Sequence, residues 1–161
     1  FGAAAVGLDV FLDTGNSLCE PISGYPVMVA EYEAVCGILP KELCEEYAKC
    51  KNEQTDIFCL YDLLGTKYAD ADWFSRLSLV SFRSVGKKQG FLLGFRPDDF
   101  SVKGKTAVVV VALSDDKLGG RRNFNAILNP WVLDTPTDNE KSKGRKNIRD
   151  TNGKIKKRLV G

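Results

Sequence analysis

The chain has 161 residues, 43% hydrophobic and 27% charged, which is typical of a globular protein and not of a disordered one. It contains no histidine, so catalytic sites of the Ser-His-Asp or Cys-His type are excluded, and the commonest metal ligand is missing. Hydrolytic chemistry would have to use carboxylates, lysine or an unusual nucleophile. No apolar run approaches the roughly 20 residues that span a bilayer. The stretch that opens at Phe1 has no basic region, so no signal peptide is expected there, and the missing initial Met suggests a piece of a longer protein.

The first elements in chain order are two strands joined by a turn-rich loop. Residues 6–12 (VGLDVFL) form an apolar and β-branched run that predicts a strand ending at Asp13. The letters TGN follow at once and are typical of a turn. Residues 27–31 (VMVAE) predict the second strand.

One segment predicts a helix clearly. Pro40 precedes residues 41–51, where Leu43, Tyr47 and Cys50 recur at helical spacing and give one apolar face. Residues 52–72 are ambiguous, because the run IFCLYDLL fits a helical turn as well as a strand.

The β pattern returns after this helical stretch. LSLVSFRSV and FLLGF flank the loop from Gly86 to Gly90, which predicts a hairpin with a polar, glycine-bounded tip. Residues 107–113 (AVVVVAL) predict a further strand, and residues 125–133 (NAILNPWVL) a short strand followed by a turn. The body of the protein, residues 1–133, is therefore predicted to be one mainly β domain, with a helical insertion over about 36–74.

The last part of the chain differs in charge. Residues 134–161 hold nine of the chain's 23 Lys/Arg residues and four of its 21 Asp/Glu residues. The body of the protein therefore has 14 basic and 17 acidic residues. This segment has few apolar residues and no periodicity, so we expect a basic, disordered tail. A basic tail can bind nucleic acid or anionic lipid, but a solvated tail is the favoured interpretation and no nucleic acid is expected as a partner.

The five cysteines, an odd number, include no C-x-x-C pair. This pattern argues against a disulfide framework and a thiolate zinc site, and it fits a reducing cytoplasm. No metal or cofactor is expected.

The strongest chemical motif is FLDTGN, in which Asp13, Thr14 and Gly15 follow an apolar strand. Apolar-apolar-Asp-Thr-Gly is the signature of aspartic proteases, where a carboxylate projects into a cleft and Gly lets a backbone N–H approach it. The chemistry needs a second Asp about 3 Å away, so that the two carboxylates share one proton. The chain has no second Asp-Thr-Gly. The simplest completion is a two-fold homodimer in which each copy contributes Asp13.

The order of elements agrees with this interpretation. Retroviral-type proteases have the Asp-Thr-Gly strand, a flap hairpin, a further strand and an apolar-apolar-Gly segment, and FLDTGN, the hairpin around Gly86 to Gly90, TAVVVVAL and AILNPWVL occur in that order. The resemblance implies a closed, retropepsin-like barrel with one inserted helical segment. Asn129 stands where that pattern has Gly, at the packing beneath the catalytic loop.

Longer blocks point to one family. LDTGNSLCEPISGYPVMVAE, FRSVGKKQGFLLGFRPD and NAILNPWVL resemble the sporulation sigma-E factor processing peptidases, the stage II sporulation protein GA family, over residues 5–133. The resemblance implies a cytoplasmic-facing aspartic protease domain, joined in full-length members to an N-terminal membrane-anchored part. It also implies homodimerisation, removal of the pro-sequence of the sigma-E precursor, and activation by a protein secreted from the forespore.

The candidate site residues have distinct expected roles. Asp13 is the expected catalytic group, supported in its geometry by Thr14 and Gly15. Asn16 would donate to the Asp13 carboxylate or serve only the turn.

Val85, Gly86 and Gly90 are expected to form the flap over the substrate or, alternatively, an ordinary hairpin. Arg83 or Arg96 would pair with acidic substrate side chains or form surface salt bridges. The competing function is a non-catalytic β-barrel that binds a partner protein and keeps Asp-Thr-Gly as a turn.

Overall fold

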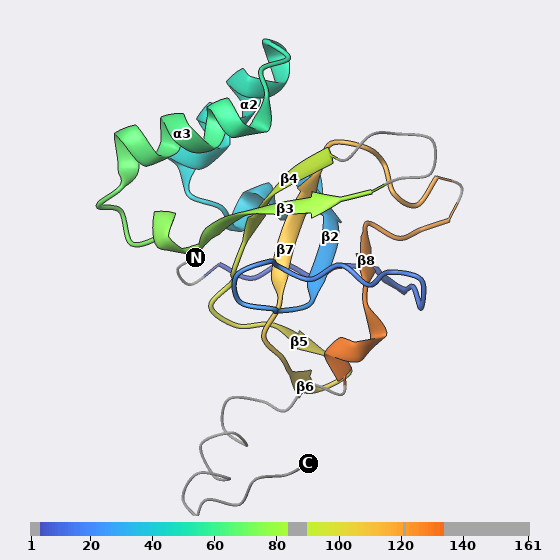
Figure 1. Cartoon of the computed structure of the whole chain (residues 1–161). Coiled ribbons are helices and arrows are strands. Elements are labelled where there is room, and N and C mark those ends of the chain that lie inside the picture. The colour runs from blue at the N-terminus through green and yellow to red at the C-terminus, as the bar shows by residue number, and fades with distance from the viewer. Residues whose placement is uncertain (1–3, 84–89, 121, 134–161) are drawn as a thin grey trace, which may run out of the picture.

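A computed structural model describes residues 4–83, 90–120 and 122–133, and its centre is a six-stranded mixed sheet (Figure 1). The strands in spatial order are β1 (Val10–Leu12), β8 (Ala126–Leu128), β2 (Val27–Glu31), β7 (Val110–Ser114), β4 (Gly90–Phe95) and β3 (Leu77–Phe82). A separate two-stranded ribbon pairs β5 (Ser101–Val102) with β6 (Lys105–Thr106). The prediction of a mainly β protein is confirmed.

The sheet is open along the described part of the chain. β1 pairs with β8 alone and β3 with β4 alone, so these two strands are the edges. The β1–β8 and β2–β7 pairs are parallel and the other pairs are antiparallel. The predicted closed barrel is not confirmed, because four strands separate β1 from β3 and no pairing joins them.

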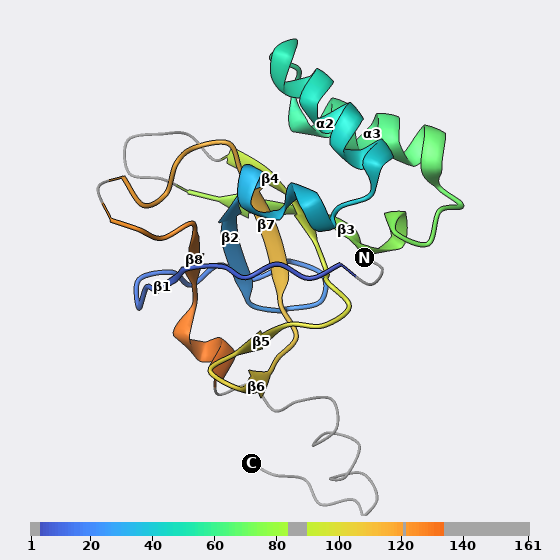
Figure 2. The ribbon, with the colours of Figure 1, turned by 180° about the vertical axis from the view of Figure 1, so that it is seen from behind.

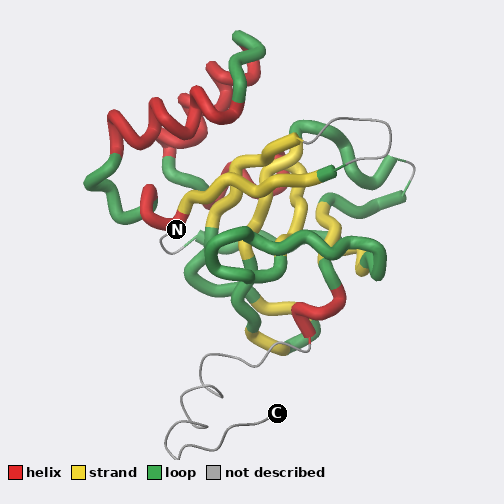
Figure 3. Tube along the Cα trace, in the orientation of Figure 1, coloured by secondary structure: helices red, strands yellow, loops and turns green. Residues whose placement is uncertain are grey.

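The helical elements are α1 (Tyr32–Val35), η1 (Cys36–Ile38), α2 (Lys41–Asn52), α3 (Ile57–Tyr68), η2 (Phe74–Arg76) and η3 (Pro130–Leu133). The two long helices, α2 and α3, lie together on one side of the molecule, whereas η3 lies at the other end, as the red segments of Figure 3 show. The helix predicted over 41–51 is present as α2. The ambiguous segment forms α3, which begins where the Asp56 carboxylate accepts a 2.8 Å hydrogen bond from the backbone N–H of Phe58.

The two faces of the sheet are covered differently. One face packs against the helices through a large cluster that joins Met28, Leu93 and Leu113 of the sheet with Leu43 of α2 and Leu64 of α3. The other face carries a smaller cluster, which comprises Val27, Val80, Val110 and Ala112 with Leu18 and Tyr25 packed on it. Leu18 and Tyr25 belong to the loop between β1 and β2, which crosses the face turned to the viewer in Figure 1. The candidate catalytic loop is thus also a cover for the core.

Two predicted features lie outside the described residues: the tip of the β3–β4 hairpin, including Val85 and Gly86, and the basic tail over 134–161. In the described ranges, none of the helices combines the length and apolar character that crossing a membrane requires.

The neighbouring residues Leu63 and Leu64 test how α3 is held. Leu64 is fully buried in the core, whereas Leu63 is 38% exposed. We expect Leu64→Ala to lower the free energy of unfolding by about 2–5 kcal/mol, because it leaves a cavity in close-packed surroundings. Leu63→Ala should cost at most about 1 kcal/mol. Urea denaturation of both variants checks this, and equal losses would contradict the packing described.

Candidate active site

Asp13 lies directly after β1 and is positioned by the neighbouring strand β8. Leu12 is in register with Leu128, and the backbone N–H of Asp13 donates a 3.1 Å hydrogen bond to the Leu128 carbonyl. This bond continues the parallel ladder by one residue. The apolar residues of β1 thereby place the carboxylate at the point where the chain leaves the sheet.

The turn after the strand holds the carboxylate. The backbone N–H of Gly15 donates to Oδ1 of Asp13 at 2.9 Å, and the Asn16 N–H donates to the Asp13 carbonyl at 3.1 Å. A Cβ added to Gly15 would lie 3.3 Å from Oδ1 of Asp13, so glycine leaves the carboxylate the room it needs. The Gly15 N–H is thus the group that bonds the Asp13 carboxylate, at a residue predicted to support it. Asp13 itself is half-buried.

Among the described residues, the side chains of Thr14 and Asn16 make no hydrogen bond to the Asp13 carboxylate. The Asn16 side chain accepts from the Leu18 N–H at 3.1 Å and donates to the Val27 carbonyl at 3.5 Å, so its amide ties the loop to β2. Of the two roles considered for Asn16, this geometry matches the turn role. Thr14 is exposed, and its hydroxyl has no hydrogen bond to the described residues. If the Thr14 hydroxyl supports the turn through a hydrogen bond, its partner must therefore lie outside the described residues.

A cleft of about 800 Å³ opens above Asp13. Its lining comes from the loop after β1, from the base of the β3–β4 hairpin and from the loop after β7: Asp13, Gly15, Asn16, Ser17, Leu18, Val29, Ser81, Phe82, Arg83, Leu92, Ser114, Asp116, Leu118 and Ile127. Half-buried apolar surface with a few polar groups is the usual composition of a site that binds a small or extended ligand.

The hairpin contributes to this cleft through its base. Phe82 is paired with Gly90, and a Cβ on Gly90 would lie 2.6 Å from the Phe82 ring. Gly90 therefore makes room for an aromatic wall of the cleft. The structure brings Arg83 to the cleft but not Arg96, which follows β4 at the other end of the hairpin.

The loop after β7 is fixed by a buried acidic residue. Glu31, at the end of β2, accepts hydrogen bonds from the Leu118 N–H at 2.9 Å and from Nζ of Lys117 at 3.0 Å, and Lys117 also reaches Glu33 at 2.6 Å. These donors, the Leu118 N–H foremost, hold the pKa of Glu31 below its usual range. Asp116 is thereby placed in the wall of the cleft. In the sequence, the pair Asp115-Asp116 is typical of a turn, and no local signal places Asp116 in a cleft.

Asn129 fills the position where the retroviral-type pattern has Gly. It is 1% exposed, and its Oδ1 accepts a 2.9 Å hydrogen bond from the Trp131 N–H at the start of η3. Glycine has no side chain to make this bond. Nδ2 of Asn129 is buried without a partner among the described residues. Compared with Gly, Asn129 therefore adds a side-chain hydrogen bond that caps the segment after β8.

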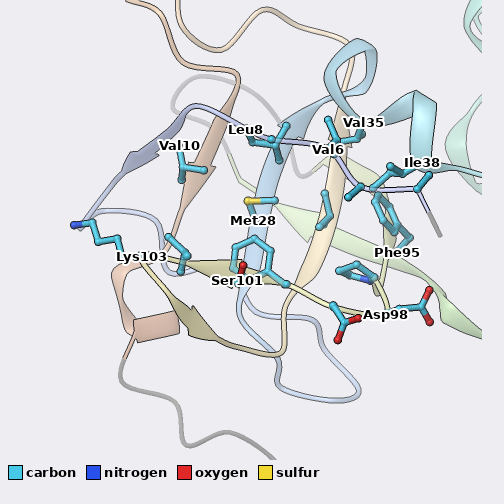
Figure 4. Close-up of a pocket in the computed structure, with 18 residues that line it drawn as sticks. Val6, Leu8, Val10, Met28, Val35, Ile38, Phe95, Asp98, Ser101 and Lys103 are labelled. Atoms are coloured by element: carbon cyan, nitrogen blue, oxygen red, sulfur yellow. The ribbon is translucent and has the colours of Figure 1, made fainter. Parts of the chain in front are cut away.

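A second hollow, of about 820 Å³, lies beneath the segment that precedes β1 (Figure 4). Met28, Phe95 and Val111 form its wall, and these residues belong to the core on the helix-covered face of the sheet. It does not include the Asp-Thr-Gly turn.

In the described ranges, no three His, Cys, Asp or Glu side chains are grouped closely enough to hold a metal ion.

Comparison with known proteins places the chain in a family of peptidases. A sequence model for the family described as "Sporulation factor SpoIIGA" matches residues 1–132, so the chain belongs to that family. No solved structure gives a significant match.

The similar proteins carry related names. The chain is 27% identical over 127 residues to the "Sporulation sigma-E factor-processing peptidase" of Priestia megaterium, a match that covers 76% of this chain and 38% of that protein. It is 28% identical to the "Putative sporulation sigma factor-processing peptidase" of Bacillus thuringiensis subsp. kurstaki, over 76% of this chain and 73% of that protein. For the "Sporulation sigma-E factor-processing peptidase" of Bacillus subtilis, the identity is 24% over 82% of this chain and 42% of that protein. The chain thus spans well under half of two of these three relatives.

Glu20 stabilises the same loop that carries Asp13. Its buried carboxylate accepts hydrogen bonds from the Ile22 N–H at 3.1 Å, the Ser23 N–H at 2.6 Å and the Ser23 hydroxyl at 2.5 Å. Burial raises the pKa of Glu20, but the bonds from Ser23 and Ile22 outweigh it and hold the pKa below its ordinary value. The ionised form is therefore favoured in the folded state.

This shift predicts a pH dependence. Because the folded pKa lies below the unfolded one, the stabilisation by Glu20 is present above an unfolded pKa of about 4.3 and is lost as the pH falls through the folded pKa. Glu20→Gln should cost about 1–2 kcal/mol at neutral pH, and should reduce the loss of stability between about pH 6 and about pH 3. Urea denaturation at several pH values measures both. The exposed Asp70→Asn is the control, and an unchanged pH profile in Glu20→Gln would contradict the role of this carboxylate.

Proposed function

We propose that this chain is the protease domain of an aspartic endopeptidase that acts as a homodimer, with one Asp13 from each copy, and that its substrate is the precursor of a sigma-E factor. The peptidase activity is supported by the family, and the substrate by the printed names of the relatives. The retropepsin-like character is part of the same proposal and rests on the Asp-Thr-Gly turn.

The observation that carries the proposal is the geometry of Asp13. A half-buried carboxylate stands at a strand end, accepts a backbone N–H, and lines a cleft of about 800 Å³. Thr14 and Gly15 beside it are exposed, so a second copy has access to this turn. A chain with one such half-site needs a second copy to pair two equivalent carboxylates.

The proposed chemistry follows from that pairing. Two close carboxylates cannot both ionise without repulsion, so the pair holds one proton. The ionised member takes a proton from a water molecule as that water attacks the scissile carbonyl, and the protonated member donates to the carbonyl oxygen. The Gly15 N–H keeps the Asp13 carboxylate oriented during both steps.

The cellular setting is proposed from the family resemblance. The domain would face the cytoplasm in a protein anchored in the membrane by an N-terminal part, and a forespore-secreted protein would activate it through that part. The matched region covers only 38% of the Priestia megaterium relative, so that relative has ample further length for such a part. No cofactor enters the proposed reaction.

Asp13→Asn tests the carboxylate directly. The near-isosteric amide keeps the turn but cannot act as the base, so cleavage of a sigma-E precursor should fall by at least about 10³-fold while thermal stability changes little. Asp9→Asn, an exposed acidic residue before β1 that does not line the cleft, is the matched control and should cleave normally. A non-catalytic binding module would instead show no change in function with Asp13→Asn.

Mixing wild-type and Asp13→Asn chains tests the sharing of the site. If active units are freely exchanging dimers that need both carboxylates, an equal mixture retains about a quarter of the activity of wild-type chains at the same total concentration. Independent monomers would retain about half. The measurement is the initial rate at a concentration where dimers predominate.

Asp116→Asn separates a shared site from a pair formed within one chain, since Asp116 lines the same cleft. A dyad of Asp13 and Asp116 in one chain would lose cleavage as completely with Asp116→Asn as with Asp13→Asn. The homodimer instead predicts that Asp116→Asn keeps measurable turnover, with the change confined mainly to KM.

A further inference from the structure

Trp131 is the most exposed aromatic side chain among the large exposed hydrophobic residues of the described ranges. It is 63% exposed, although its neighbours Asn129 and Val132 are each 1% exposed. Exposing a large aromatic surface to water is unfavourable, because aromatic rings bury more apolar area than any other side chain when they find a partner. Trp131 is thus exposed to solvent although a buried valine follows it and a buried asparagine lies two residues before it, and this exposure calls for an explanation.

The backbone that presents Trp131 is fixed. The Trp131 N–H donates to Oδ1 of Asn129 at 2.9 Å, and the Val132 N–H donates to the Asn129 carbonyl at 3.2 Å. Val132 packs into the main core. The indole therefore projects from a short, well-anchored helical turn, and little conformational entropy would be lost when it is covered.

This turn is connected directly to the Asp13 loop. The Leu128 carbonyl accepts the Asp13 N–H at 3.1 Å, and Trp131 follows Leu128 after two residues. η3 and the end of β1 lie on the same side of the molecule, while α3 lies on the opposite side (Figure 2). A second copy that approaches the exposed Thr14 and Gly15 would meet η3 at the margin of its contact.

We propose that Trp131 anchors the interface between two copies of this chain, beside the paired Asp13 loops. This inference rests on the proposed function, because the second copy is the occupant that the incomplete site requires. Tryptophan is among the residues that most often dominate the binding free energy of protein interfaces, especially where its backbone is preorganised. Asn129 then has a positioning role, since its side chain fixes the turn from which the indole projects.

The test is the dimerisation of the full 161-residue chain, measured by sedimentation equilibrium. Trp131→Ala should raise the dimer dissociation constant by about tenfold or more. Cleavage of the precursor should fall at low protein concentration and recover at high concentration, because the catalytic groups are intact. Phe58→Ala is the control: Phe58 is also an exposed aromatic residue (43% exposed) but lies on α3, and its removal should leave the dimer constant unchanged.

A covalent tandem of two Trp131→Ala chains provides a second measurement. Linking raises the effective concentration of one copy for the other, so the tandem should regain cleavage if the indole acts through association. Failure of the tandem to recover, with a normal dimer constant for the single-chain variant, would overturn the proposal and indicate a substrate contact.

Iodide quenching separates a second copy from another part of the same chain. In a Trp73→Phe background, Trp131 is the only tryptophan, and it should become protected as protein concentration rises. Protection at concentrations where sedimentation shows only monomers would mean that the chain itself covers Trp131, and would overturn the proposal. The two proposals fail separately: full cleavage by Asp13→Asn contradicts the proposed function, whereas an inactive Asp13→Asn with an unchanged Trp131→Ala dimer contradicts only the role of Trp131.

Discussion

The hydrogen bond from the Asp13 N–H to the Leu128 carbonyl is the contact on which the site depends. It ends a parallel pairing of only three residues between β1 and β8, and the Asn125 and Ala126 N–H groups, which both donate to the Asp9 carbonyl, secure the start of that pairing. Parallel neighbours need a long connection, and here that connection runs from β1 to β8 through almost the whole described domain. The first and last strands of the described domain therefore set the position of one carboxylate.

The loop after Asp13 has two structural roles. Leu18 and Tyr25 cover the small core cluster on one face of the sheet, while Asp13, Gly15 and Asn16 line the cleft. Polar groups also hold the loop: Asn16 bridges Leu18 and Val27, and the Glu20 carboxylate binds three donors. Such a loop can hold the Asp13 carboxylate in place without a helix or a long strand to support it.

Sequence reasoning located the elements whose signal is local. The turn at Asp13 follows from one short motif, and α2 from apolar residues at helical spacing, while the catalytic role of Asp13 stays a prediction. It left α3 open, because a short apolar run does not distinguish a helix from a strand and only the Asp56 cap decides it. The place of Asp116 in the cleft and the exposure of Trp131 were not predicted, since both depend on how β7 and β8 lie relative to β1. The open sheet could not be anticipated either, because closure depends on which distant strands pair, and resemblance to a barrel family had suggested otherwise.

The brevity of β1 has a mechanical consequence. A three-residue edge strand is held by few bonds, so it can detach at a smaller free-energy cost than the central strands, which open only with the whole domain. Its departure would carry Asp13 away from the cleft and leave β2, β7 and β4 intact. The position of the Asp13 carboxylate therefore depends on a strand pairing that breaks more easily than the pairings at the centre of the sheet.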